Sequence, residues 1–258
     1  LLPAFILLLL PMMNYETHIF DDAAAVARGV ADLIAEKALQ SKLSGQKCSI
    51  AVSGGSTPKA LFELLAEEEY RTTIAWEAIL LFWVDERCVP PAHAESNYGM
   101  TYDALLQYAF IPAENVFRMK GEEIPGNEAL RYGKLLHQLL PARNSMPVFD
   151  LILLGMGDDG HTASIFPDQM HLLNSDKAVE VATHPVSGQK RITLTGPAIN
   201  EARQLVFMIT GQGKADIVAT IVEKKEEAKK YPASYVHDTT GKTEFYMDKA
   251  AAAKLKQQ

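Results

Sequence analysis

Residues 48–58 read C-S-I-A-V-S-G-G-S-T-P, and this stretch contains the three parts of a strand–loop–helix unit. The apolar run Cys48–Val52 has the length and composition of a strand that is buried on both faces. Gly54 and Gly55 suit a tight turn, while Pro58 suits the first position of a helix with Thr57 as its N-cap. The stretch therefore predicts a buried strand that leads directly into a helix through a glycine-rich loop.

The same unit recurs along the chain. Three further apolar runs, at residues 79–84, 149–154 and 204–209, each lead into a polar or glycine-containing loop. Helical patterns are found at residues 22–40, 58–68, 97–109, 127–140 and 214–224, and a last helix is expected from Asp248 onward. This alternation predicts a Rossmann-like α/β fold, a doubly wound and mostly parallel sheet with helices on both faces. Ligands of such folds bind beyond the carboxyl ends of the strands.

The composition limits the class of protein. The 258 residues are 48% apolar and 22% charged, as is typical of a globular domain rather than a disordered chain. A formal net charge of -7 disfavours nucleic acid as a partner, so an anionic ligand must be small and locally compensated. The two cysteines, Cys48 and Cys88, lack the paired spacing of a metal or redox motif, which indicates a reducing cytoplasm.

Residues 1–11, L-L-P-A-F-I-L-L-L-L-P, form an apolar N-terminal segment. A bilayer span needs about 20 apolar residues, and the basic region and cleavage site of a signal peptide are missing, so neither membrane insertion nor export is expected. Because Met12 and Met13 directly precede ordinary sequence, we expect translation to start there. Residues 1–11 would then be extra, with residues 12–258 forming a single domain. A short interfacial anchor is the alternative.

The most distinctive loop, at residues 155–164, reads G-M-G-D-D-G-H-T-A-S. The flanking Gly160 leaves the imidazole of His161 accessible, and an adjacent carboxylate could orient the ring for proton transfer. His161 is therefore predicted to act as a general base. A metal site would need a second His or Cys at ligand spacing, so no metal is predicted.

The loop after Val52 is a candidate anion site. Gly54, Gly55 and Ser56 can present backbone N–H groups and a hydroxyl at a helix N-terminus. A plain strand-to-helix turn is the more common meaning of a single Gly-Gly pair. The loop therefore suggests phosphate binding only in combination with other features.

Three cations could complete such a site. Arg87 ends the charged triplet D-E-R, which could equally be a solvated rim. Lys214 opens a helix, where the dipole favours an anion, so it indicates either a bound anion or a solvated lysine. Arg191 lies beside a short strand and could also be a charge at a sheet edge.

Together these segments closely resemble the 6-phosphogluconolactonases. The resemblance lies in S-G-G-S-T-P at 53–58, D-E-R-C-V-P at 85–90, S-N-Y at 96–98 and G-M-G-D-D-G-H-T-A-S-I-F-P at 155–167. R-I-T-L-T at 191–195 and T-G-Q-G-K at 210–214 extend it over nearly the whole chain from Asn14. It implies hydrolysis of 6-phospho-D-glucono-1,5-lactone to 6-phosphogluconate in the oxidative pentose phosphate pathway, on a Rossmann-like fold and without a cofactor.

The resemblance also implies roles for individual residues. His161 would activate the water that attacks the lactone carbonyl, and Asp159 would orient His161. Arg87 would stabilise the negative charge that develops on the carbonyl oxygen, with Asp85 and Glu86 expected to brace it. The 6-phosphate would be held by Gly54, Gly55, Ser56, Arg191 and Lys214.

Two other functions are compatible with parts of this pattern. Glucosamine-6-phosphate deaminases or isomerases resemble the chain in the first glycine-rich loop and in D-G-H, but carry a Glu five residues after the His. Phe166 stands at that position here, and D-E-R replaces their usual D-E-Y. A non-catalytic sugar-phosphate sensor would add a DNA-binding segment, for which the acidic chain is expected to have no room. The oligomeric state is not predicted.

Overall fold

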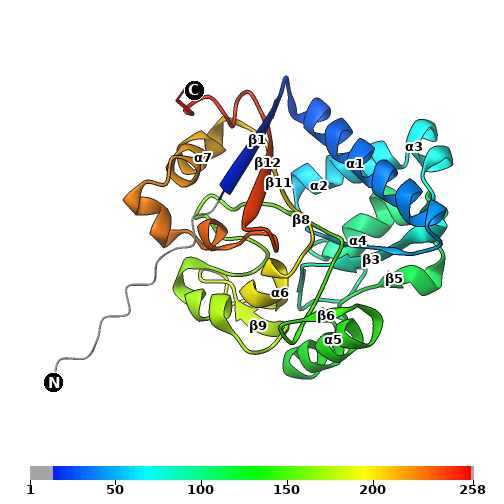
Figure 1. Cartoon of the computed structure of the whole chain (residues 1–258). Coiled ribbons are helices and arrows are strands. Elements are labelled where there is room, and N and C mark those ends of the chain that lie inside the picture. Colours follow the sequence, from blue (N-terminus) through cyan, green and yellow to red (C-terminus); the bar gives the residue numbers. More distant parts are fainter. Residues whose placement is uncertain (1–13, 257–258) are drawn as a thin grey trace.

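A seven-stranded parallel sheet forms the centre of the computed structural model, which describes residues 14–256 (Figure 1). Every strand pairing in this sheet is parallel. The strand order is β1 (Asn14–Phe20), β12 (Lys242–Asp248), β11 (Leu205–Ile209), β8 (Leu151–Leu154), β2 (Cys48–Val52), β3 (Ile79–Trp83) and β5 (Val116–Phe117). The predicted Rossmann-like, mostly parallel sheet is confirmed.

Helices cover both faces of the sheet because successive side chains of each strand point to opposite sides. Ile50 packs in the hydrophobic cluster with α1 (Ala23–Leu43), α2 (Ser56–Leu65) and α3 (Glu68–Thr73). Its neighbour Ala51 packs in the cluster with α5 (Pro125–Leu139), α6 (Gly196–Asn200) and α7 (Ala215–Val222). The two clusters make a three-layer α/β sandwich, as the doubly wound prediction requires.

A second, antiparallel sheet extends from the end of β3. Its order is β4 (Asp85–Arg87), β10 (Lys190–Leu194) and β9 (Val179–Thr183), and its register pairs Arg87 directly with Arg191. Strands β6 (Ala142–Arg143) and β7 (Met146–Pro147) form an antiparallel hairpin with a two-residue turn. The remaining helical segments are α4 (Asn97–Thr101), the π-helical turn η2 (Tyr102–Leu106), and the 3₁₀ turns η1 (Trp76–Ala78), η3 (Ala113–Asn115), η4 (Pro167–Asn174), η5 (Gln212–Lys214), η6 (Glu226–Lys230) and η7 (Pro232–Tyr235).

The predicted helix after Asp248 is wrong. Strand β12 continues to Asp248, and turns follow it. The Asp248 carboxylate accepts the backbone N–H groups of Gly211, at 3.0 Å, and of Ala251, at 2.7 Å. The bond from Gly211 ties the strand end to the loop after β11. Strands β1 and β12 themselves were not predicted, because neither contains an apolar run as long as those of the predicted strands.

The start of α2 also differs from the prediction. The helix begins at Ser56 with Gly55 as its N-cap, and Gly55 has a φ of 107°, which a residue with a side chain rarely adopts. Thr57 is therefore inside the first turn, where its hydroxyl lies 2.9 Å from the hydroxyl of Thr210. This contact joins the loop after β2 to the loop after β11.

The apolar segment 1–11, expected to be extra, lies outside the described residues, so the structure does not test that expectation. Within residues 14–256, no helix combines the length and the apolar character needed to cross a bilayer.

Replacing Phe82 with Ala is expected to destabilise the fold by about 3–5 kcal/mol, because the ring is completely buried. Phe82 stacks on Phe117 at 4.9 Å and meets Phe149 edge-on at 5.4 Å. Urea unfolding followed by circular dichroism measures the loss. Phe110, whose ring is 67% exposed, provides the matched control, and equal losses for the two variants would contradict the proposed core.

Candidate active site

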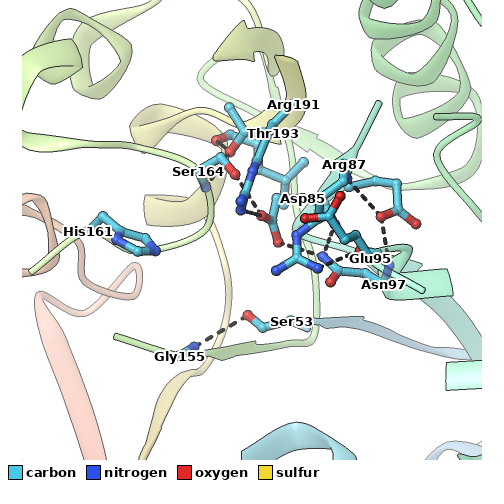
Figure 2. A network of polar contacts seen from close by, with 12 residues as sticks. Ser53, Asp85, Arg87, Glu95, Asn97, Gly155, His161, Ser164, Arg191 and Thr193 are labelled. Carbon is cyan, nitrogen blue, oxygen red and sulfur yellow. Dashed lines mark hydrogen bonds and ion pairs between the residues drawn. The ribbon is translucent and has the colours of Figure 1, made fainter. Parts of the chain in front are cut away.

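The site lies where the strand order of the central sheet reverses. From β2 the chain proceeds to β3 and β5 on one side, whereas β8, β11 and β12 lie on the other side. Loops leave in opposite directions at such a switch point, and a crevice remains between them. The Ser53 hydroxyl donates to the carbonyl of Leu153 at 2.9 Å. It also accepts from the N–H of Gly155 at 3.3 Å (Figure 2). It thereby holds the two diverging loops side by side.

A cavity of about 240 Å³ opens at this point. Its wall combines the loops after β2, β8 and β11 with residues of β4 and β10. Seven of the residues predicted for the site line it: Gly54, Gly55, Ser56, Arg87, His161, Arg191 and Lys214. Asp159 lies behind His161 rather than in the lining. The loops that the sequence singled out therefore converge on one place.

His161 and Asp159 form a hydrogen-bonded pair. Imidazole Nδ1 lies 2.6 Å from Asp159 Oδ1, and the same oxygen accepts the backbone N–H of His161 at 3.1 Å. Burial raises the pKa of Asp159, but the hydrogen bond and charge of His161 outweigh it and lower that pKa to about 2. An ionised Asp159 keeps the proton on Nδ1 and leaves the lone pair of Nε2 available. A Cβ at position 157 would lie 2.2 Å from Nδ1, so Gly157 allows this close approach.

Asp85 is a buried carboxylate that joins three other parts of the site (Figure 2). Its Oδ2 accepts from the Ser164 hydroxyl at 2.7 Å, and its Oδ1 accepts from Asn97 Nδ2 at 3.2 Å. The guanidinium of Arg191 lies 4.0 Å from Oδ2. The expectation that Asp85 braces Arg87 is therefore wrong for the side chains, because the ion pair of Asp85 is with Arg191.

Glu86 fixes the backbone around the neighbouring loop. Its buried carboxylate accepts the N–H groups of Arg87 and Asn97, both at 2.7 Å, and of Tyr98 at 2.8 Å. It also accepts the Ser96 hydroxyl at 3.0 Å. Burial raises the pKa of Glu86, while these hydrogen bonds oppose the shift. Glu86 thus braces the backbone of Arg87, as expected, and ties β4 to the start of α4.

Arg87 and Arg191 place two positive charges opposite each other on adjacent strands, an arrangement that costs free energy. Arg87 donates from Nη1 to the carbonyl of Glu95 at 2.5 Å, and Arg191 lies 5.8 Å above the ring of Phe166. Burial lowers the pKa of Arg191, Asp85 opposes that shift and Arg87 adds to it. The Nε atoms of both arginines are buried without a hydrogen-bond partner. The wall they form suits an anion.

Lys214 supplies a third cation from the loop after β11. Its side chain is 22% exposed and forms an ion pair with Asp158, which is 89% exposed. A surface pair of this kind is weak, so a more highly charged anion in the cavity could replace Asp158. The structure therefore favours the anion interpretation of Lys214 over that of a solvated lysine.

Asn97 was not among the residues predicted for this site. The Ser96 side chain caps α4 by accepting the N–H of Gly99 at 3.0 Å. Asn97 is instead buried and lines the cavity. Its position within the S-N-Y motif was the available signal.

One cluster of metal-ligand side chains occurs among residues 14–256, and it lies away from the cavity. The ligand atoms of Glu16, His18 and Glu244 are within 4.8 Å of one another on the strands β1 and β12. The ammonium of Lys242 lies 2.6 Å from Glu16 and 3.2 Å from Glu244. Because this cation already compensates the carboxylates, the cluster is better described as an ion-pair network.

The fold and the site define a class of protein, a Rossmann-like α/β enzyme with a cationic pocket and a histidine–carboxylate pair. The sequence pattern of the glucosamine-6-phosphate isomerases/6-phosphogluconolactonase family matches residues 21–245. The chain belongs to this family.

Individual relatives agree over most of their length. A 6-phosphogluconolactonase of Treponema pallidum is 42% identical over 79% of this chain and 83% of its own. One of Haemophilus influenzae is 41% identical over 89% of this chain and 97% of its own. The crystal structure of a devB protein superposes with a TM-score of 0.89 at 42% identity, covering 94% of this chain and 100% of that chain.

Proposed function

We propose that this protein hydrolyses 6-phospho-D-glucono-1,5-lactone to 6-phospho-D-gluconate in the oxidative pentose phosphate pathway. The observation that carries the proposal is the placement of the His161–Asp159 pair and three cations around one cavity. The names of the two lactonase relatives support the same reaction. Addition of water to a lactone transfers no electrons, so the reaction needs no redox cofactor.

In this mechanism His161 transfers the proton in both chemical steps. Nε2 takes a proton from water as the water oxygen bonds to C1, and the electrons of the carbonyl double bond move to the carbonyl oxygen. When the tetrahedral intermediate collapses, the bond from C1 to the ring oxygen breaks. The imidazolium returns its proton to that oxygen, which becomes a hydroxyl. The resulting acid releases its own proton to solvent.

Arg87 is assigned to the negative charge that develops on the carbonyl oxygen. Arg87 lines the cavity, and Glu95 and Glu86 hold the residue in place through its Nη1 and its backbone N–H. A donor that is already oriented stabilises a developing oxyanion without having to reorganise.

The 6-phosphate is assigned to the other side of the cavity. The N-terminus of the ten-residue helix α2 faces this side, with Gly54 and Gly55 just before it and Ser56 as its first residue. The first backbone N–H groups of a helix have no partner within the helix and can bind an anion. Arg191 and Lys214 supply local positive charge at the cavity, although the protein as a whole has a net charge of -7. Binding at the phosphate would position the reacting carbon near His161.

Phe166 favours the lactonase over the deaminase. Its buried ring lies 4.8 Å from the imidazole of His161, where the resemblance places a Glu in deaminases. An apolar ring cannot transfer a proton. A non-catalytic sensor would have no use for the hydrogen bond between His161 and Asp159, so that pair favours an enzyme.

We also propose that residues 12–258 act as one catalytic domain in the reducing cytoplasm. The single central sheet supports one domain, and the free thiols of Cys48 and Cys88 support a reducing compartment. The net charge of -7 supports a small-molecule substrate and no nucleic-acid partner.

Replacing His161 with Gln should lower kcat about 10²–10⁴-fold, because proton transfer is lost, while the KM for the lactone changes little. The lactone is generated in the cuvette by oxidation of glucose 6-phosphate, and its spontaneous hydrolysis is subtracted. His137→Gln, on the exposed side of α5, is the matched control. Near-normal turnover by a folded His161→Gln variant would refute the base.

Asp159→Asn should lower kcat roughly tenfold or more, because a neutral amide stabilises the imidazolium formed during the reaction less well than the ionised carboxylate does, while the KM for the lactone changes little. With a pKa of about 2, Asp159 stays ionised from about pH 5 to pH 9, so the loss should be similar throughout that range. Asp176→Asn, an exposed site, is the control. Near-normal kcat for a folded Asp159→Asn variant would sink this prediction.

Lys214→Ala should lower kcat/KM for the phosphorylated lactone roughly tenfold or more, because a charge-assisted hydrogen bond to phosphate is lost. Unphosphorylated gluconolactone should be nearly unaffected. Lys134→Ala, exposed on α5, controls for the loss of one charge. If both lactones lose activity equally, Lys214 does not bind the phosphate.

A further inference from the structure

Phe166 lies between the two halves of the candidate active site. The centre of the His161 imidazole lies 4.8 Å from the centre of its ring, and the two rings are tilted by 49°. The guanidinium carbon of Arg191 lies 5.8 Å from the centre of the same ring. One apolar side chain therefore contacts both the residue assigned to proton transfer and a cation assigned to the phosphate.

The hydrogen bond of His161 does not by itself determine where Nε2 points. Asp159 holds the imidazole at Nδ1. The χ2 torsion of a histidine is broad, so the ring can still tilt about that bond and move Nε2. The ring of Phe166 packs against the imidazole and restricts this tilt. The position of the atom that transfers the proton thus depends on two neighbours, one charged and one aromatic.

The guanidinium of Arg191 is held only loosely by its carboxylate partner. Nη1 lies 4.0 Å from Asp85 Oδ2, whereas a charge-assisted hydrogen bond to a carboxylate is about 2.7–2.9 Å long. An ion pair at the longer distance attracts the charge but does not orient the guanidinium plane. The face of an aromatic ring attracts a cation and offers it a flat surface, which Phe166 provides here. The plane of the guanidinium therefore depends on Phe166.

The ring of Phe166 is itself firmly held. It is completely buried, and the ring of His184 meets it at 5.2 Å and an angle of 76°. His184 belongs to the turn between β9 and β10, where its Nδ1 accepts the backbone N–H of Ser187 at 3.1 Å. The backbone carbonyl of Phe166 accepts the N–H of Gln169 at 2.9 Å. These contacts make the ring a fixed support for its two polar neighbours.

Resting on the proposed function, we propose that Phe166 is a positioning residue for both halves of the reaction. Its ring fixes the tilt of the His161 imidazole and the plane of the Arg191 guanidinium. Phe166 does not line the cavity, so it acts on the substrate through these two neighbours. Loss of the aromatic ring should therefore change kcat through His161 and KM through Arg191.

Replacing Phe166 with Leu removes the ring but keeps an apolar side chain. For 6-phosphogluconolactone, kcat should fall roughly tenfold or more, because a small displacement of a catalytic group is costly. The KM should rise roughly threefold, because the cation is no longer held in the orientation that binds phosphate. For unphosphorylated gluconolactone, kcat should fall by the same factor while KM stays near its wild-type value.

Two double variants test whether these effects pass through the named neighbours. In a His161→Gln background, measured at high protein concentration, Phe166→Leu should not lower kcat further. In an Arg191→Ala background, it should not raise KM further but should still lower kcat. A general loosening of the fold would instead add the same factor in every background.

Phe149→Leu is the matched control. Phe149 is completely buried in the same hydrophobic cluster as Phe166 and does not line the cavity. This variant should lose comparable stability in urea and keep the wild-type kcat and KM. Phe166→Met, which also lacks a ring, is measured in parallel. It should reproduce the kinetic changes of Phe166→Leu, and it provides the comparison if the leucine variant does not fold.

The outcomes separate this proposal from the proposed function. Kinetic constants for the Phe166 variants that match those of Phe149→Leu would overturn the inference. A loss of the same size in every background would likewise assign Phe166 a purely structural role. Failure of the wild-type protein to hydrolyse the phosphorylated lactone would overturn the proposed function itself.

Discussion

The buried carboxylate of Asp85 is the interaction on which the architecture of the site depends. It accepts hydrogen bonds from Ser164 and Asn97 and lies opposite Arg191, so it joins three segments that are far apart in the chain. A buried charge is tolerated only when nearly all its hydrogen-bonding capacity is used. Loss of any one partner would therefore weaken the position of Asp85 and its contacts with the other two. In this way the network couples the segments that form the cavity wall.

This network also explains how an acidic protein can present a cationic pocket. Arg87 and Arg191 face each other across two antiparallel strands, and burial makes the charge of Arg191 costly. Asp85 compensates one of them, and Asp158 compensates Lys214 at the rim. Part of the positive charge remains for an anion, because both arginines line the cavity and Asp85 pairs with Arg191 alone. His161 is oriented by Asp159, and both residues lie on the loop after β8, which carries none of these three cations.

Much of the fold could be predicted because its signals are local. The run Cys48–Val52 is a strand with the predicted limits, and the helix predicted at 127–140 is found at Pro125–Leu139. Buried parallel strands are apolar on both faces and are easily recognised. Strand β1 has no such signal, because it lies at the edge of the sheet, pairs on one side only and is mostly polar. The prediction of a helix from Asp248 was wrong because Asp248 is the last residue of β12. Its carboxylate accepts the N–H of Gly211, a contact between distant parts of the chain that no local pattern shows.

The sequence by itself determined which residue types stand at the carboxyl ends of the buried strands, and therefore that Gly55, Arg87, His161 and Lys214 would meet. That result follows from the parallel topology, which brings these ends to one edge. Only the tertiary structure decided the partners within the site. Asp85 is 79 positions from Ser164, and no local pattern shows that it binds Ser164 and Asn97 rather than Arg87. The burial of Asn97 is likewise a property of that packing, since Asp85 accepts from its amide nitrogen and Gly54, which has no side chain, allows its amide oxygen to approach the loop after β2.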